Sequence, residues 1–592
     1  MKKKIFLTVL CLLLKSYFSY SQITLKNDDI AAYKNISQEK IFVHQNTTFL
    51  LTGEYLYYKV YCINVNSNIL SDISKIAYVE LLGTDKVSVF KHKIKLNNGL
   101  GQGDFLIPTK IPSGNYKLIA YTQWMKNSQQ NQFFQSDISI INPFQENQSS
   151  LLKKDTTATE VQNLSLKKEH IKNNNSLINS IGFDYLDLSI NANTFKNREK
   201  VVLTIKGLKN NLSNGNYSIS VRKIDTLQIP KKLTTSAYMS LYPQKPSSNS
   251  IINTSIYLPE LRGELLSGKV IYNNTKLASP NMKVALSIQG KQSIFKIATT
   301  NDLGVFYFNI PEEYENSDAI IQIIGSERNK FKITMNDHSS INSENLNFYD
   351  FKITPKIKDY LLERSIYNQI ESTYSGIKPN TIKNLDSLNP IYNSKAKIYN
   401  LNDYTRFPTI KETIVEIINE VYIKQKKENS FFYVKLYNQL FESKLPALVL
   451  VDGVLIQNHN ELLNLNAMNI RKFSILNNTY IFDSMIFNGV ISIETITGDY
   501  LTNLSGTYIE KFQLFKPLVI KNYFNQIYEN NKILDRIPDY RSQLLWVPNF
   551  NLNNDDFLFF YTSDNNGDYE ICLEGFTKEG IPISLRKIIS VK

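Results

Sequence analysis

The sequence predicts a mainly β protein, in which several β-sandwiches follow one another together with one small α/β unit. Short runs of alternating apolar and polar residues, separated by Gly, Asn and Pro turns, recur along most of the chain. Aromatic residues make up 12% of the chain, with 36 Tyr and 32 Phe, and this composition favours pleated sheets over helices. A length of 592 residues allows roughly three to five domains.

The first 21 residues have the pattern of a secretory signal peptide. Three lysines follow Met1, residues 5–14 form an apolar run, and Ser19-Tyr20-Ser21 fits the small-x-small cleavage rule. The apolar run makes a helix of about 15 Å, which is too short to anchor the chain in a hydrocarbon core of about 30 Å. We therefore expect an exported protein of the periplasm, the outer membrane or the cell surface, with no transmembrane segment in the mature chain.

The formal charge of +13 does not point to a nucleic-acid partner. Lys and Glu are interspersed along the chain, and there is no Arg-rich stripe or recognised nucleic-acid module. The excess of cations is more typical of a solvated surface, with an acidic glycan or a lipid headgroup as its neighbour. We expect no nucleic acid among the partners.

The pattern of apolar runs divides the mature chain into units. Runs such as YLYYKVY, KIAYVEL and YKLIAY predict a first β-sandwich at residues 23–141. Residues 142–180 lose this periodicity and are rich in Asn, Ser, Lys, Glu and Thr, which predicts an exposed linker. The later predicted units are a second β-sandwich at 181–258, a third at 261–350, an α/β unit at 400–499 and a C-terminal β domain at 500–592.

The α/β unit opens with a helix signature. Thr409-x-x-Glu412 is a capping box, and it is followed by apolar residues at helical spacing, namely Ile410, Ile414, Ile417, Ile418 and Val421. We expect this helix to cover one face of its own sheet, with a partner-binding helix as the alternative. A buried strand then ends in the turn Val451-Asp452-Gly453, and further strands are expected at 470–476 and 490–496.

A search for catalytic patterns finds none in the sequence. No two of the five His residues lie at the spacing of metal ligands. They are His44, His92, His170, His338 and His459. Gly-x-Ser-x-Gly, phosphate-binding Gly-rich and Cys-x-x-Cys motifs are absent. After the signal peptide only Cys62 and Cys572 remain, and we expect both to be buried free thiols. The sequence therefore predicts no enzymatic activity, no cofactor and no metal.

Several segments resemble known domains. EKIFVHQNTTFLLTGEYLYYKVY, with SKIAYVELLG and GLGQGDFLIPTKIPSGNYKLIAYTQWMKN, resembles the macroglobulin-type second domain of large exported proteins of Gram-negative bacteria. Residues 261–311 are similar to the carboxypeptidase regulatory-like domain, an immunoglobulin-like β-sandwich. LPALVLVDGVLIQ, IRKFSILNN and NGVISIETITG resemble the plug domain of TonB-dependent outer-membrane receptors. RIPDYRSQLLWVPNFN and FYTSDNNGDYEICLEGFTKEG resemble the C-terminal β domain of the same composite, Bacteroidota-like proteins.

Departures from these families limit what the resemblance implies. Macroglobulins trap proteases through a Cys-Gly-Glu-Gln thioester, whereas the sequence around Cys572 is ICLEG, so we expect no covalent trapping. TonB-dependent receptors continue from the plug into a β-barrel of several hundred residues, whereas 93 residues follow Asp499 (592 minus 499). The plug-like unit is therefore expected to dock on a separate outer-membrane protein, such as a β-barrel transporter or a secretion component, with a plug-derived binding module as the alternative.

The resulting expectation is a non-enzymatic scaffold of the cell envelope, associated with outer-membrane transport or secretion machinery through its plug-like unit. Val451, Asp452, Gly453 and His459 are the candidate partner-contact residues, and a simple tight turn is the other interpretation of Asp452-Gly453. The alternative function is a periplasmic or surface protein that binds carbohydrate or peptide. Its candidate stacking platforms are Trp124 and Trp546, unless both pack in cores. A third interpretation, cargo of a dedicated secretion system, rests on the terminal sequence RKIISVK.

Overall fold

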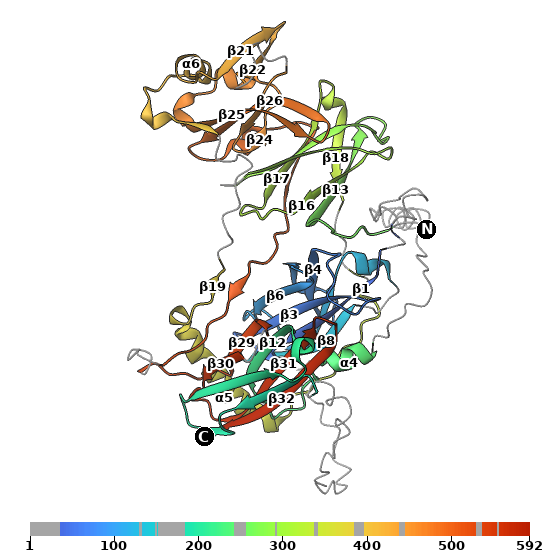
Figure 1. The fold of residues 1–592 in the computed structure, drawn as a ribbon, viewed down its shortest axis with the longest axis vertical. Helices are drawn as coiled ribbons and strands as arrows, with labels where there is room; N and C mark the ends of the chain where they lie inside the picture. Colours follow the sequence, from blue (N-terminus) through green and yellow to red (C-terminus); the bar gives the residue numbers. More distant parts are fainter. Residues whose placement is uncertain are drawn as a thin grey trace, which may run out of the picture. The chain divides into compact units, whose positions relative to one another are not determined.

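The chain forms two compact units of mostly β structure (Figure 1). The computed structural model describes residues 33, 36–128, 133–148, 151, 184–241, 256–290, 293–336, 341, 343–383, 396–436, 445–528, 536–552 and 556–592. The predicted signal peptide and most of the predicted linker lie outside these residues. Unit 1 contains Arg262–Ser339 and Leu385–Lys516, and unit 2 contains Gln22–Leu261, Ser340–Asn384 and Pro517–Lys592.

The prediction of a mainly β fold built from sandwiches is confirmed, since strands make up most of the regular structure and lie in paired sheets. Within the part of the chain that is described, no helix is long and apolar enough to cross a membrane. Cys62 and Cys572 are free and buried, as expected from their positions. The boundaries of the individual domains stay predictions, and the pairing of the strands gives a different grouping for two of them.

The first sandwich of unit 2 is made by residues from the predicted range 23–141. One sheet has the order β1-β3-β6, with β1 (Glu39–Gln45), β3 (Tyr55–Asn64) and β6 (Leu100–Leu106). The other has the order β2-β8-β7-β4-β5, with β2 (Phe49–Leu51), β8 (Phe134–Ile141), β7 (Gly114–Tyr121), β4 (Ile76–Gly83) and β5 (Ser88–Lys95). The short helix η1 (Trp124–Asn127) follows β7. Apolar residues that point inward from both sheets form one core, as alternation along each strand requires.

The second sandwich of unit 2 joins two ranges that the sequence analysis predicts as separate domains. Its first sheet has the order β10-β32-β31-β12-β29 and its second β30-β11-β9. The strands are β9 (Leu186–Ile190), β10 (Thr194–Phe195), β11 (Lys200–Gly207), β12 (Gly215–Lys223), β29 (Gln543–Asn551), β30 (Asp556–Tyr561), β31 (Gly567–Thr577) and β32 (Pro582–Val591). Helix η2 (Asn210–Ser213) precedes β12, and α4 (Thr235–Leu241) follows it.

The two predicted ranges form one sandwich because β12 pairs on both sides with strands from the end of the chain. It is antiparallel to β31 through Ile219 and Leu573, and to β29 through Ser220 and Trp546. Residues from 186–221 and from 544–591 share one apolar core. The separate predicted domains at 181–258 and 500–592 are thus corrected, because each range holds only part of the strands that close this core.

The sandwiches of unit 2 also pack against each other. Every residue of β1 is buried, so both faces of this strand are covered. One of the two faces packs into the core of the first sandwich. The other face contacts the second sandwich, where His44 Nδ1 and Ser218 Oγ lie 2.6 Å apart. Tyr61 also donates to Ser218 Oγ at 2.9 Å, and its ring lies 5.5 Å from that of Phe576. Unit 2 is therefore held by buried contacts between its sandwiches as well as within them.

One helix of unit 2 carries part of the candidate site. It is α5 (Lys358–Thr373), preceded by η4 (Pro355–Ile357) and followed by η5 (Ser375–Ile377). The chain then forms β19 (Thr381–Ile382), which pairs with β28 (Lys521–Asn522). Figure 1 shows this helix beside the strands at the C-terminal end of the chain. It lies outside every unit predicted from the sequence.

Unit 1 contains one sandwich and one α/β layer structure. The sandwich has sheets of order β16-β13-β18 and β15-β14-β17-β27. Its elements are β13 (Glu264–Tyr272), β14 (Lys283–Ile288), β15 (Ile294–Thr299), β16 (Val305–Ile310), β17 (Asp318–Ile324), η3 (Arg328–Lys330), β18 (Phe331–Met335) and β27 (Ile509–Gln513). Because β27 pairs with β17, residues 509–513 complete this sheet and do not belong to a C-terminal β domain.

The α/β part of unit 1 has a sheet of order β20-β25-β26-β23-β24 and a separate hairpin β21-β22. Helix α6 (Ile410–Glu416) has the predicted capping box, with Thr409 and Glu412 bonded in both directions. It ends before Val421, which begins β21. The other elements are β20 (Lys397–Asn400), η6 (Leu401–Asp403), β21 (Val421–Lys426), β22 (Asn429–Val434), β23 (Leu448–Val451), β24 (Val454–Leu455), α7 (Asn460–Leu463), η7 (Ala467–Asn469), β25 (Ile470–Phe482), β26 (Met485–Thr495) and η8 (Tyr500–Asn503).

Candidate functional site

Three of the four residues predicted to contact a partner, Val451, Asp452 and Gly453, belong to a tight turn in unit 1, and His459 lies just before α7. Val451 and Val454 are cross-strand partners, so Asp452 and Gly453 are the two residues of the loop between β23 and β24. Both have positive φ angles, +49° and +80°, as a two-residue hairpin turn with the twist of its strands requires. A Cβ on Gly453 would lie 2.4 Å from Cβ of Ser293, so the backbone approaches the neighbouring sandwich closely.

The polar side chains of this group are occupied inside the unit. The Asp452 carboxylate accepts hydrogen bonds from the backbone N–H and the hydroxyl of Thr495, at 2.8 and 2.7 Å, and from the Tyr500 N–H at 3.2 Å. His459 Nδ1 accepts from the Phe432 N–H at 2.9 Å, and burial lowers the pKa of His459 to about 4. The turn accounts for Val451, Asp452 and Gly453, and a hydrogen bond to the backbone of β22 accounts for His459, while the contact role of all four stays a prediction.

The two tryptophans lie in different environments, although the sequence alone does not separate them. Trp124 is fully buried in η1, where its indole N–H donates to the Ser37 carbonyl oxygen at 2.9 Å. It is a core residue. Trp546 is also largely buried, but it lies near the start of the edge strand β29 and lines a cavity of about 630 Å³ within unit 2.

This cavity, which we call the aromatic cleft, is bounded by segments distant in sequence. They are the start of β3, the start of β29, the C-terminal half of α5 with the turn after it, and the segment around β28. Its aromatic lining consists of Tyr55, Tyr57, Tyr367, Tyr523, Phe524, Tyr540 and Trp546. The volume lies within the range of about 300–1,000 Å³ in which proteins bind ligands of the size of a drug molecule.

Ring stacking fixes the shape of two walls of the aromatic cleft. The Tyr57 ring lies between Tyr55, at a centroid distance of 5.4 Å and 9° from parallel, and Trp546, at 5.9 Å and 20°. Tyr523 meets Tyr57 edge-on at 5.0 Å. In the other wall Tyr367 and Tyr540 are stacked at 4.3 Å and 3°. Alternation along β3 brings Tyr55 and Tyr57 to the same face, which explains how a local pattern makes a platform.

A buried ion cluster fixes α5 against this wall. Arg364 donates to both carboxylate oxygens of Glu54 at 2.8 Å, and it also forms an ion pair with Asp225. Arg222 reaches Glu54 at 3.3 Å. Burial acts to raise the pKa of Glu54, but the two guanidinium groups prevail and lower it. Glu54 is therefore ionised near neutral pH.

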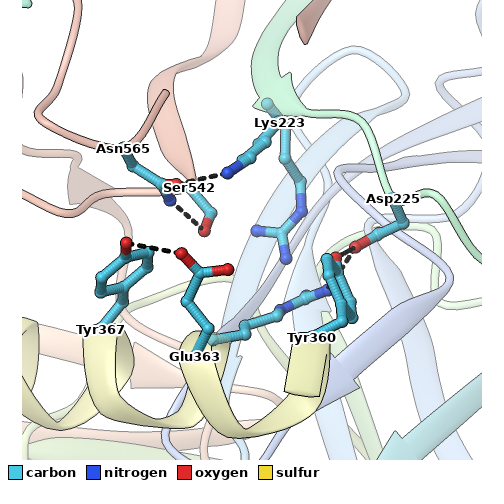
Figure 2. A pocket seen from close by; sticks show the side chains of 9 residues that line it. Lys223, Asp225, Tyr360, Glu363, Tyr367, Ser542 and Asn565 are labelled. Carbon is cyan, nitrogen blue, oxygen red and sulfur yellow. Dashed lines mark hydrogen bonds and ion pairs between the residues drawn. The ribbon is translucent and has the colours of Figure 1, made fainter. Parts of the chain in front are cut away.

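A small pocket adjoins the ion cluster (Figure 2). Side chains of α5, among them Tyr360 and Tyr367, face Asp225, Lys223 and Asn565 on the opposite segments. Its accessible space is about 20 Å³, roughly that of a single water molecule. This pocket is therefore too small for a ligand, and the aromatic cleft is the larger of the two cavities.

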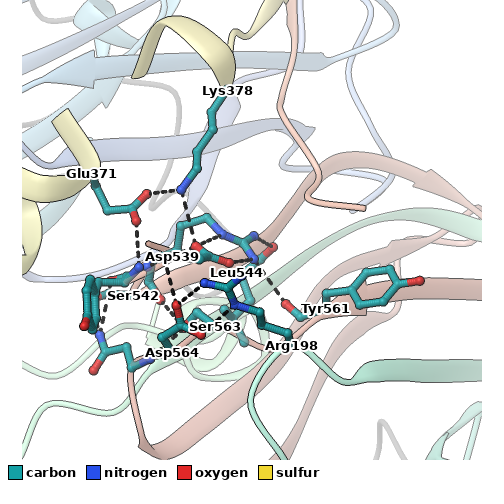
Figure 3. Close-up of polar contacts among 12 residues, drawn as sticks. Arg198, Glu371, Lys378, Asp539, Ser542, Leu544, Tyr561, Ser563 and Asp564 are labelled. Atoms are coloured by element: carbon teal, nitrogen blue, oxygen red, sulfur yellow. Dashed lines mark hydrogen bonds and ion pairs between the residues drawn. The ribbon is translucent and has the colours of Figure 1, made fainter. Parts of the chain in front are cut away.

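A second ion cluster supports the floor of the aromatic cleft (Figure 3). Arg541 donates to both carboxylate oxygens of Asp539 at 2.7 Å, and Lys378 lies 3.4 Å from Asp539 and 2.7 Å from Glu371. Burial acts to raise the pKa of Asp539, but Arg541 and Lys378 hold it far below its usual range. Arg541, Lys378 and Glu371 all line the cleft, so the cluster orders its floor before any ligand binds.

The arrangement is suited to binding. Among the residues described, no three His, Cys, Asp or Glu side chains are placed to hold a metal ion. The two carboxylates that line the aromatic cleft, Glu54 and Glu371, are both engaged in ion pairs. Of the sequence-predicted residues only Trp546 belongs to the cleft, and α5, which contributes Tyr367, has no counterpart among the predicted elements.

Comparison with protein-family models and with curated proteins gives no match. Among solved structures, the chain is similar to Salmonella alpha-2-macroglobulin reacted with methylamine, with 8% identity over 93% of this chain and 39% of that chain, and a TM-score of 0.22. It is also similar to trypsin-activated alpha-2-macroglobulin from Escherichia coli, with 8% identity over 94% and 42% of the two chains, and a TM-score of 0.22. The chain thus spans less than half of these proteins, and a likeness at this level identifies neither a family nor an activity.

Proposed function

We propose that this chain is a non-enzymatic binding protein of the bacterial cell envelope, and that the aromatic cleft of unit 2 is its ligand site. The observation that carries the proposal is a cavity of about 630 Å³ with preformed aromatic walls. Placement in the envelope rests on the predicted signal peptide. This function corresponds to the carbohydrate- or peptide-binding alternative drawn from the sequence.

The order of the site before ligand binding supports this function. The ring of Tyr57 is stacked between those of Tyr55 and Trp546, and the two ion clusters hold α5 and the floor in place. Because these side chains are already fixed, a ligand loses less free energy to their ordering when it binds. The ion-paired carboxylates support a non-enzymatic role, since a general acid must carry a proton that Glu54, with its lowered pKa, does not hold near neutral pH.

The two tryptophans allow a direct test of this function. In a Trp124→Phe variant, Trp546 is the single tryptophan and reports from the aromatic cleft. We expect its fluorescence to change saturably when the low-molecular-mass fraction of a cell-envelope extract is added. Tyr57→Ala in the same background removes one neighbour of Trp546 and is expected to weaken the response at least about tenfold, the effect of losing roughly 1.4 kcal/mol of stacking.

The control is Tyr349→Ala, which replaces an exposed tyrosine of unit 2 that does not line the aromatic cleft. This variant is expected to respond like the Trp124→Phe parent. If no fraction changes the fluorescence of Trp546, the cleft is not a ligand site and the proposed function is wrong.

Docking of the plug-like unit on an outer-membrane transport or secretion component is a second candidate function. One observation favours it. In the β25–β26 hairpin, Ile481 and Ile486 are cross-strand partners, and they are 68% and 49% exposed. Phe482 on the opposite face packs at 5.1 Å against Phe295 of the sandwich in the same unit. The hairpin is therefore held from one side and presents two apolar side chains on the other.

The docking candidate is tested by affinity purification of the tagged chain from gently solubilised envelopes of its source cells. We expect one outer-membrane protein in near-stoichiometric amount, lost on deletion of residues 445–498 and in Ile481→Asp/Ile486→Asp. Val415→Asp, at a side chain 68% exposed on α6, is the matched control and is expected to retain the partner. Retention of the partner by the deletion variant would remove the docking function.

A further inference from the structure

We infer that the ligand of the aromatic cleft is a neutral oligosaccharide. This inference rests on the proposed function, because it names the ligand class of the same site. Three properties of the cleft carry it: the balance of charges in its lining, the aromatic and neutral hydroxyl groups that it presents, and the occupied backbone groups of the strand at its border.

The charges of the aromatic cleft are balanced. Each cation in the lining has a carboxylate partner: these cations are Arg222, Arg364, Lys378, Lys521 and Arg541. The carboxylates paired with them are Glu54, Asp104, Asp225, Glu371 and Asp539, so five positive charges meet five negative ones. An anionic ligand would compete with these carboxylates for their partners and would leave buried charges unpaired. A ligand without net charge avoids this cost.

The aromatic and hydroxyl groups suit a sugar. Tyr57 is covered on both faces by Tyr55 and Trp546, so the half-buried ring of Tyr55 at the end of this stack offers the apolar surface on which the C–H face of a pyranose can pack. Burial raises the pKa of Tyr57 and Tyr523, so their hydroxyls stay protonated; each already interacts with a side-chain amide, of Asn380 and Gln102 respectively, and can still donate a hydrogen bond to a ligand. Sugar hydroxyls need partners of this kind. A cavity of about 630 Å³ has room for a di- or trisaccharide.

A peptide would fit the same walls less well, because the strand that borders them offers few free backbone groups. β29 is an edge strand, and an extended peptide would pair with its backbone. However, the carbonyl oxygen of Leu544 accepts from Arg541 at 3.2 Å, and that of Leu545 accepts from the Gln543 side chain at 2.7 Å. Two acceptors beside the aromatic cleft are thus already used. Ligand recognition here depends on side chains, as in the binding of sugars.

Isothermal titration of the full-length chain with defined probes tests this inference. The probes are neutral trisaccharides of the gluco, manno, xylo and chito series, trigalacturonate as an anionic sugar, and neutral tripeptides. We expect at least one neutral trisaccharide to bind, with an affinity unchanged between 50 and 500 mM NaCl because no ionic contact is screened. Tyr57→Ala is expected to weaken binding at least about tenfold, and Tyr349→Ala to leave it unchanged.

Tyr55→Ala provides a second test if Tyr57→Ala does not fold, since Tyr55 also belongs to the stacked wall. Binding of trigalacturonate or of a tripeptide, with sensitivity to these variants, would overturn the inference and leave the proposed function in place. Binding of no probe, together with no response of Trp546 to envelope fractions, would overturn both.

Discussion

Replacing Arg364 by Met is expected to destabilise unit 2 by about 3–5 kcal/mol, the cost of removing one partner from a buried ion cluster. Arg364 is 7% exposed and lies between Glu54 and Asp225, so its loss leaves two buried carboxylates without their main cation. Arg222 compensates only in part, because it contacts Glu54 and not Asp225. The same change releases α5 and with it one wall of the aromatic cleft.

Urea unfolding followed by tryptophan fluorescence measures this loss. Both tryptophans belong to unit 2, so their signal reports its unfolding. Lys75→Met breaks the more exposed pair with Asp72 and is the matched control, with an expected loss below about 1 kcal/mol. Adding Asp225→Asn to Arg364→Met is expected to recover part of the loss, since it removes one of the unpaired charges. A loss below about 1 kcal/mol in Arg364→Met would show that the cluster does not hold the helix.

Helix α5 illustrates why part of the site could not be predicted from the sequence. A surface helix is recognised by an apolar stripe that it buries. In α5 the buried residues are Arg364 and Ser365, whereas Leu362 and Ile366 are 57% and 47% exposed. The usual apolar stripe is reduced to Tyr360 and Leu361, which pack against a small apolar cluster, and a buried ion cluster supplies the other contacts that hold this helix. In contrast, α6 buries Ile410 and Ile414 and has a capping box, and these two local patterns predict it.

The pairing of strands is the other property that the sequence does not reveal. Alternation correctly indicates that β12 and β31 are strands, since each strand has a local period of two residues. Their partnership depends on packing between segments more than 300 residues apart, as in the contact of Ser218 with Glu574. Local patterns therefore predict the fold class and many of the strands, while the joining of the ranges 181–258 and 500–592 follows only from the three-dimensional core.

The candidate site also depends on contacts between distant segments, which the sequence does not reveal. The sequence predicts Trp546 and Trp124 alike as candidate stacking residues, because both are large amphipathic side chains. Only the fold distinguishes them, since β29 brings Trp546 beside Tyr57 of β3. The Tyr55-x-Tyr57 repeat was a visible signal, but alternating tyrosines also occur in ordinary sandwich strands. A repeat of this kind predicts a platform only when a neighbouring segment leaves its face open.

Asp539→Asn is expected to destabilise unit 2 by about 3–5 kcal/mol at pH 7, because it leaves the buried Arg541 without its carboxylate. Lys378 also loses one of its two partners. Urea unfolding of both proteins, followed by tryptophan fluorescence, gives the difference. Asp72→Asn, at an exposed carboxylate of the same unit, is the control and is expected to change stability by less than about 1 kcal/mol.

The stability difference between wild type and Asp539→Asn is expected to depend on pH. Burial opposes ionisation of Asp539, but Arg541 and Lys378 lower its pKa in the folded state below the unfolded value of about 3.9. A carboxyl group with a depressed folded-state pKa contributes stability above the unfolded pKa, and this contribution is lost as the pH falls toward the folded-state pKa. The difference between wild type and Asp539→Asn is therefore expected to be constant from pH 7 to about pH 5 and to shrink below about pH 4. A difference that stays constant down to pH 2.5, or that grows, would mean that the ionised carboxylate does not carry the stabilisation and that the floor of the aromatic cleft is held by packing alone.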